Sequence, residues 1–194
     1  VVSPKDEVIR NVGKVYPGRA SASPIIDLFI TLLSMGLEGY SGLLSERNRL
    51  LPKFEQKFSE IAEKYGERIL RCPRNTISFG ITLDTLTRGG GDLSEDETLK
   101  KKVSKEITYF GSMLFTRCVS GTRVVPRGES KTMGNDKFIG FGSSTEKYGN
   151  PYMTAACAIG LGEDECDEFF ARLDKAFKDF FANRKKDDAK KAGS

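Results

Sequence analysis

The most chemically suggestive stretch of the sequence is 16–24, which reads YPGRASASP and places one arginine among small residues. Ser23 is a preferred helix cap and Pro24 suits the first helical position, so a helix should begin directly behind the small residues. The free amide groups and positive dipole end of a helix start attract anions, and Arg19 adds a planar fork of donors suited to phosphate. The pattern predicts either a phosphate site at Arg19 or a capped helix with an exposed arginine.

The sequence contains no histidine, which limits the chemistry that its own side chains can perform. Ser–His and Cys–His nucleophile systems and histidine metal sites are excluded within the chain. The four cysteines show no CxxC spacing, so no zinc site is predicted. Catalysis would have to rest on lysine, carboxylates, a cofactor or another polypeptide segment.

The totals are those of a folded domain of ordinary size: 194 residues, 38% apolar and 30% charged. A net charge of +4 permits a polyanionic partner without demanding one. No signal peptide is visible in 1–16, and scattered cysteines suit a reducing compartment, so we expect a cytoplasmic protein. The apolar run 25–35 contains Asp27 and is too short to span a bilayer, so no membrane partner is expected.

Periodicity and turn residues predict the elements that must position these side chains. Helices are expected at 4–15, from Ser23 through the apolar run, at 40–65 with a kink or split at Pro52, at 99–115 and at 164–181. Strands are expected at 77–83, 123–126 and 138–141, while 152–159 fits either a strand or a helix. The glycine-rich stretch 87–97 is expected to be a flexible loop with no assigned role, and the tail 183–194 to be frayed.

This order of elements predicts an α/β protein, more closely a small α+β domain in which helices cover one side of a short sheet. We expect a helical segment over 1–66, the α+β domain over 67–183 and a charged tail over 184–194. The helices at 25–35 and 40–65 carry more apolar surface than a small sheet needs. We therefore expect them to pack on a further domain or another subunit, and the isolated chain to associate.

Three blocks of sequence resemble the O-phosphoseryl-tRNA:selenocysteinyl-tRNA synthase family. The first is 15–24 with LLSMG at 32–36, the second is GSMLFTR with VSG and RVVP at 111–126, and the third is AA, AIG and RLD within 155–174. They occur in the same order over nearly the whole chain. The resemblance implies the C-terminal portion of a fold-type-I enzyme that uses pyridoxal phosphate and forms a homotetramer.

The same resemblance implies the reaction and its substrates. A selenocysteine tRNA charged with phosphoserine loses its phosphate through pyridoxal-phosphate chemistry, and selenium from selenophosphate adds to the dehydroalanyl product. The cofactor acts as an electron sink while the protein binds and orients the substrate.

Two arginines match functional positions of the family. Arg19 matches the arginine that holds the phosphate of the phosphoseryl group, in agreement with the anion site suggested by its surroundings. Arg117 matches the arginine that reads the discriminator base, the unpaired base next to the CCA end of the tRNA. If that base is a guanine, a bidentate guanidinium contact is chemically reasonable. From the residues alone, Arg117 could equally be a solvated arginine near a helix end.

Other family positions do not carry over. Ala182 stands where the family has a tRNA-contacting lysine. Arg184, Lys185 and Lys186 follow at once and could supply the phosphate contact, or could simply form a solvated tail. The Schiff-base lysine and the cofactor's phosphate-binding loop lie, in the family, upstream of the part that matches Val1. We therefore expect no catalytic residue in this chain and no activity from it alone.

Two alternatives remain open. The chain could be a tRNA-binding or assembly module without an active site. It could also come from a related enzyme that converts phosphoseryl-tRNA to cysteinyl-tRNA.

Overall fold

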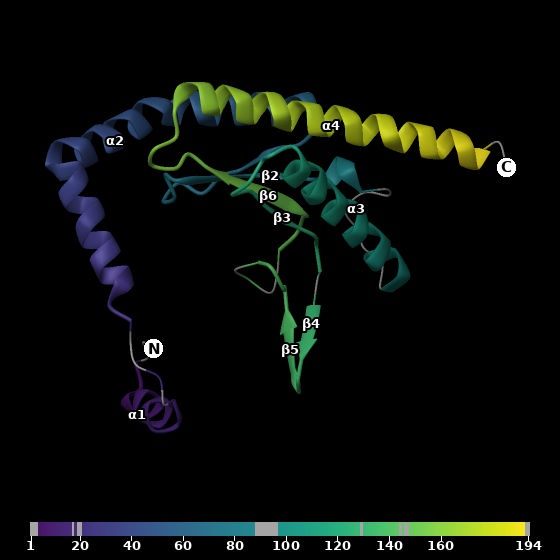
Figure 1. The fold of residues 1–194 in the computed structure, drawn as a ribbon. Helices are drawn as coiled ribbons and strands as arrows, with labels where there is room; N and C mark the ends of the chain where they lie inside the picture. Colours follow the sequence, from purple (N-terminus) through teal and green to yellow (C-terminus); the bar gives the residue numbers. More distant parts are fainter. Residues whose placement is uncertain are drawn as a thin grey trace. The chain divides into compact units, whose positions relative to one another are not determined.

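The computed structural model describes residues 4–16, 18, 21–87, 97–128, 130–143, 145 and 148–192 (Figure 1). The chain divides into two compact units, Val1–Gly42 and Leu43–Ser194, and each is described by itself. Most of the predicted loop at 87–97 lies outside the described residues. The predicted division of the chain into a helical segment, an α+β domain and a tail stays a prediction.

The first unit contains helix α1, Asp6–Val15, and the start of helix α2, Ser23–Lys64. Both helices are where the sequence predicts them. The hydroxyl oxygen of Ser21, however, accepts the amide of Ser23, so Ser21 takes the capping role predicted for Ser23. The apolar side chains at the start of α2 are exposed: Ile25, Ile26, Leu28, Phe29, Ile30, Leu32 and Leu33.

Helix α2 is interrupted at Gly36 and not split at Pro52. Gly36 has φ 62° and ψ −177°, a conformation that glycine adopts at little cost. Pro52 remains inside the helix and is exposed, so water can bond the carbonyl group that loses its amide partner. The split predicted at Pro52 was therefore wrong.

By length and composition α2 could cross a membrane, although one such helix near the N-terminus is weak support for a span. The run 25–35 noted in the sequence has 11 residues, whereas the window of α2 that passes this test has 18.

The second unit is built on a four-stranded antiparallel sheet with the order β1-β2-β6-β3. The strands are β1 Ile69–Leu70, β2 Ser78–Thr82, β3 Arg123–Val125 and β6 Tyr152–Ala156. The ambiguous stretch at 152–159 is thus a strand, and it occupies the centre of the sheet beside β2. Ile81 of β2 and Met153 of β6 face one another in register and are fully buried.

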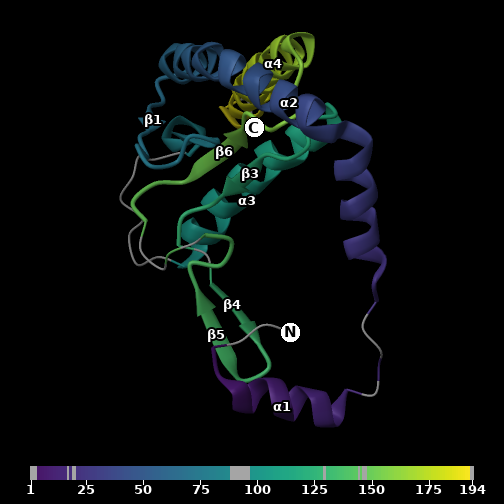
Figure 2. The ribbon, with the colours of Figure 1, turned by 90° about the vertical axis from the view of Figure 1, so that its left-hand side faces the viewer.

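Helices α3, Glu97–Thr116, and α4, Glu163–Ala192, pack with the second part of α2 against this sheet (Figures 1 and 2). Ion pairs join α2 to α4 at a sequence offset of 110, in Lys53–Glu163, Lys57–Asp167 and Lys64–Asp174. A constant offset means that the two helices run parallel. The short sheet covered by helices confirms the predicted fold class.

The core draws on all of these elements, and its largest fully buried side chains are Leu50, Phe54, Phe58, Ile81, Leu83, Leu86, Phe110, Ile107, Leu114, Met153, Leu173 and Phe177. The apolar face predicted at 40–65 therefore packs within the chain's own core. For 50–62 the expected packing on another domain or subunit was wrong, whereas for the helix at 25–35 it stays a prediction.

A buried carboxylate fixes the segment that follows β2. The side chain of Glu67 accepts hydrogen bonds from the hydroxyl groups of Thr82 and Thr85 and from the amides of Asp84 and Thr85. These amides begin the short 3-10 helix η1, Asp84–Leu86, so Glu67 satisfies donors that would otherwise be buried unpaired.

Strands β4, Ser130–Met133, and β5, Asp136–Ile139, form a separate hairpin that projects from the end of β3 (Figure 1). All of its strand residues are exposed. β5 lies two residues earlier than the predicted strand at 138–141, and β4 falls between two predicted strands, where no strand was expected. The predicted frayed tail was also wrong, since α4 continues to Ala192.

Candidate nucleic-acid interface

Arg117 directly follows α3, and its side chain is held at the carboxyl end of that helix. Nη1 donates to the carbonyl oxygen of Met113 at 2.9 Å, and Nη2 donates to Oδ2 of Asp179 on α4 at 2.7 Å. An arginine commonly bonds the last carbonyl groups of a helix in this way. The side chain is 24% exposed, so the guanidinium is fixed from within while part of it still reaches solvent.

The backbone after Arg117 closes α3 in a Schellman turn. The amide of Val119 donates to Leu114 O and that of Cys118 to Phe115 O, both at 3.0 Å. Cys118 takes the left-handed conformation, with φ 56°, at the position where glycine is usual. Leu114 and Val119 are buried against the core, which accompanies this motif. The turn therefore gives Arg117 a defined backbone position.

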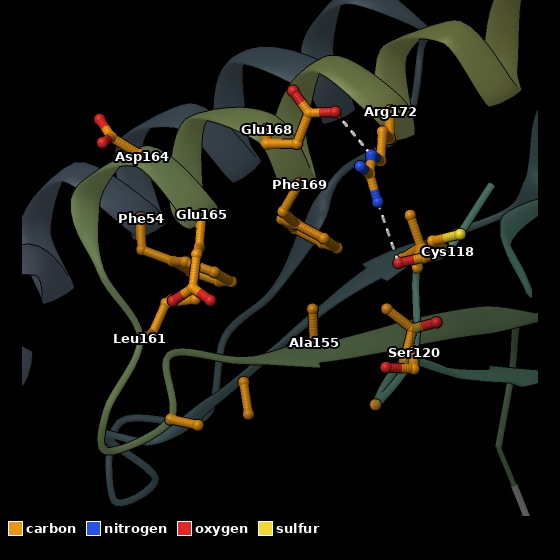
Figure 3. A pocket seen from close by; sticks show the side chains of 15 residues that line it. Phe54, Cys118, Ser120, Ala155, Leu161, Asp164, Glu165, Glu168, Phe169 and Arg172 are labelled. Carbon is orange, nitrogen blue, oxygen red and sulfur yellow. Dashed lines mark hydrogen bonds and ion pairs between the residues drawn. The ribbon is translucent and has the colours of Figure 1, made fainter.

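Arg172 on α4 holds the same turn from the other side. Its Nε donates to Oε1 of Glu168 at 2.7 Å, and its Nη1 donates to the carbonyl oxygen of Cys118 at 3.2 Å (Figure 3). The turn is thus positioned between α3 and α4 by two arginines, Arg117 and Arg172.

The guanidinium of Arg117 has donor capacity beyond its observed bonds. Arginine carries five N–H donors, and two are used by Met113 and Asp179. Nε is buried and has no partner among the described residues. The unused N–H groups of Nη1 and Nη2 are the ones left to meet an external acceptor such as a base edge or a phosphate.

A pocket of about 660 Å³ opens beside this turn (Figure 3). Phe54, Ala155 and Phe169 give it an apolar floor, and the carboxylates of Asp164 and Glu168 lie at its edge. Among the described residues that line it none is a lysine, which pyridoxal phosphate needs for a Schiff base. The pocket does not fit that cofactor, and no catalytic step is assigned to this chain.

The other predicted site residues are not gathered at Arg117. Arg184 donates Nη1 to the carbonyl oxygen of Thr85 at 3.0 Å, so part of its guanidinium is bound to the segment after β2. Lys185 is exposed on α4. Arg19 lies outside the described residues.

Asp179 was not predicted from the sequence as the partner of Arg117. Asp179 lies on one stripe of α4 with Glu168, Arg172 and Lys175, at the spacing of neighbours on a helix face. That spacing was readable from the sequence. Its approach to Arg117, 62 residues away, depends on how α3 and α4 pack.

A family model and several known proteins are similar to this chain over most of its length. The sequence model of a family described as O-phosphoseryl-tRNA(Sec) selenium transferase, SepSecS, matches residues 1–178. The O-phosphoseryl-tRNA(Sec) selenium transferase of Dictyostelium discoideum is 37% identical over 180 residues, which cover 91% of this chain and 37% of that protein. The protein of the same name from Caenorhabditis briggsae is 32% identical over 98% of this chain and 36% of its own length.

A solved structure is similar to this chain in fold. The crystal structure of an archaeal O-phosphoseryl-tRNA(Sec) selenium transferase matches with a TM-score of 0.53 at 23% identity, over 89% of this chain and 33% of that one. This chain therefore shares its fold with about a third of that structure.

The chain belongs to the O-phosphoseryl-tRNA(Sec) selenium transferase family. It spans about a third of the length of the curated relatives it matches, whose names identify them as selenium transferases.

Proposed function

We propose that this chain is the tRNA-facing part of an enzyme that converts O-phosphoseryl-tRNA(Sec) to selenocysteinyl-tRNA(Sec) in the cytoplasm. The reaction would use selenophosphate and pyridoxal phosphate in a homotetramer. Membership of the family supports this reaction. The lysine that binds the cofactor would come from protein outside these 194 residues, so the chain alone should not catalyse the reaction.

The observation that carries the proposal is the placement of Arg117. Its side chain is fixed by Met113 and Asp179 but keeps unused donors at a partly exposed edge. A guanidinium held in this way loses little conformational entropy when it binds a base edge. We propose that Arg117 reads the discriminator base and that Arg19 binds the phosphate of the phosphoseryl group.

Arg184 and Lys185 are proposed as weaker contacts to the tRNA backbone near the end of α4. Lys185 is exposed and able to meet a phosphate, whereas Arg184 already donates to Thr85. Loss of Lys185 should therefore cost more RNA affinity than loss of Arg184.

A fluorescence-anisotropy titration of the folded chain tests the proposal. Selenocysteine tRNA and an ordinary serine tRNA are compared at near-physiological salt. A clear preference for the selenocysteine tRNA supports the proposed recognition surface. Equal affinity for the two, in a sample shown to be folded by circular dichroism, contradicts it. A preference for cysteine tRNA over both would instead support the related cysteinyl-tRNA enzyme.

A role in assembly is a second candidate, favoured by the apolar start of α2. Ile25, Phe29 and Leu33 are all more than half exposed in the monomer. The chain itself does not bury these apolar side chains. Exposed patches of this kind commonly mark interfaces. Sedimentation at increasing concentration should show association of the chain, and a clean monomer would count against this role.

A further inference from the structure

A second pocket, of about 370 Å³, lies against the same turn and includes Arg117 itself. It shares Cys118, Glu168 and Arg172 with the first pocket and extends along α4 to Lys175. It therefore joins the residue proposed to read a base to a stretch of α4 that has no assigned role.

The pocket lining is cationic. Arg117, Arg172 and Lys175 line it together with the single carboxylate of Glu168. Glu168 is paired with Arg172 at 2.7 Å, and Arg172 is further engaged with the turn, so these two groups largely satisfy one another. Asp179 pairs with Arg117 in the same way. The positive charge that remains uncompensated belongs to Lys175.

Lys175 differs from the next lysine along the helix. It is exposed, and among the described residues it has no hydrogen-bond or ion-pair partner. Lys178 also projects from α4, but its Nζ lies 2.6 Å from Oδ2 of Asp174. An unpaired ammonium group beside a pocket can bind an anion without first giving up a partner.

We propose that Lys175 binds a backbone phosphate of the RNA strand whose discriminator base is read by Arg117. This inference rests on the proposed function of Arg117. Lys175 and Arg172 lie on one face of α4, at i and i+3, so both project toward the turn that carries Arg117. A lysine acts on phosphate as a point charge, which positions the strand and adds affinity but carries no sequence information.

The test uses the folded 194-residue chain and selenocysteine tRNAs that carry each of the four bases at the discriminator position. Lys175→Ala should weaken binding to all four by a similar factor, about threefold to tenfold. It should also reduce the slope of log affinity against log salt by about 1. The ratio of affinities among the four bases should stay as in the unaltered chain.

Lys178→Ala is the matched control, because it removes the same charge from the same helix. It should leave the salt slope nearly unchanged, since Lys178 is already paired with Asp174. If Lys175→Ala behaves like Lys178→Ala while Arg117→Ala still lowers base discrimination, the inference about Lys175 is overturned and the proposed function stands. If Arg117→Ala changes neither affinity nor discrimination, the proposed function itself fails.

Inorganic phosphate separates an RNA-backbone site from a site for a free anion. Added at constant ionic strength, it should displace the tRNA from the unaltered chain and from Lys175→Ala equally poorly. Strong displacement that disappears in Lys175→Ala would show that the pocket takes free phosphate, and would overturn the inference.

Discussion

Nη2 of Arg117 lies 2.7 Å from Oδ2 of Asp179, which ties the end of α3 to the middle of α4. The pair is partly exposed, with 24% of the Arg117 side chain and 40% of the Asp179 side chain accessible. A pair in this setting contributes little to stability. Its main effect should be on the orientation of the guanidinium.

Asp179→Ala should therefore lower base discrimination without lowering overall RNA affinity. The guanidinium loses one of its two anchors, while removal of a carboxylate favours a polyanion. A bidentate base contact is worth about 1–3 kcal/mol, so discrimination among the four discriminator bases should fall severalfold. Anisotropy titrations with selenocysteine tRNAs that carry each of the four discriminator bases measure this discrimination.

Asp179→Glu is the matched control for this effect, because it keeps the carboxylate on the same helix face. It should restore at least part of the discrimination. Unchanged discrimination in Asp179→Ala would show that Met113 and the turn orient Arg117 without the help of Asp179.

Asp174 should make stability depend on pH in the acid range. Burial alone would raise the pKa of its carboxyl group, but hydrogen bonds from Lys178, Lys64 and Tyr65 outweigh it and lower the pKa to about 2. The unfolded value is about 4. The contribution to stability is therefore complete above about pH 4 and is lost as the pH falls toward 2.

Urea unfolding of Asp174→Asn measures this contribution. At pH 7 the variant should be less stable by about 1 kcal/mol. Between pH 4 and pH 2 it should lose stability less steeply than the unaltered chain. An equal loss in both proteins over that range would assign the acid sensitivity to other carboxylates.

Replacement of the buried carboxylate of Glu67 should be among the most destabilising single polar changes in the second unit. Glu67→Gln keeps one acceptor oxygen but turns an NH2 group toward donors from Thr82, Asp84 and Thr85. The free energy of unfolding should fall by about 2–3 kcal/mol. Urea titration with Glu60→Gln, an exposed helix position, gives the comparison. A cost no greater than that of Glu60→Gln would contradict the role given to the Glu67 network.

Cys118→Gly should stabilise the chain by up to about 1 kcal/mol. The residue has φ 56°, where a side chain is strained and glycine is not. Thermal unfolding measures the gain, with Cys72→Gly as a control at another exposed cysteine. A loss of stability in Cys118→Gly would mean that contacts of the thiol outweigh the backbone strain.

The elements that the sequence predicted well are those with strong periodicity. The apolar stripe of α4 is clear because Phe170, Leu173 and Phe177 recur at helical spacing and all meet the core. The strand β2 alternates poorly and was predicted on other grounds, because the stretch is short, rich in branched side chains and bounded by turn residues.

The elements that were missed depend on longer-range structure. β4 has no apolar alternation because each of its residues is exposed, and only pairing with β5 makes it a strand. The break at Gly36, by contrast, falls between the two helices predicted at 25–35 and 40–65. At the candidate site, family resemblance pointed to Arg117, but its partner Asp179 is found only when α3 and α4 pack together.

We propose that Arg117 gives this chain its preference for the selenocysteine tRNA. The most direct test is a paired anisotropy titration of the unaltered chain and Arg117→Ala against selenocysteine tRNA and serine tRNA. We expect a clear preference for the selenocysteine tRNA in the unaltered chain and its loss, by about tenfold or more, in Arg117→Ala. A preference that survives in a folded Arg117→Ala would contradict it and move recognition to other residues.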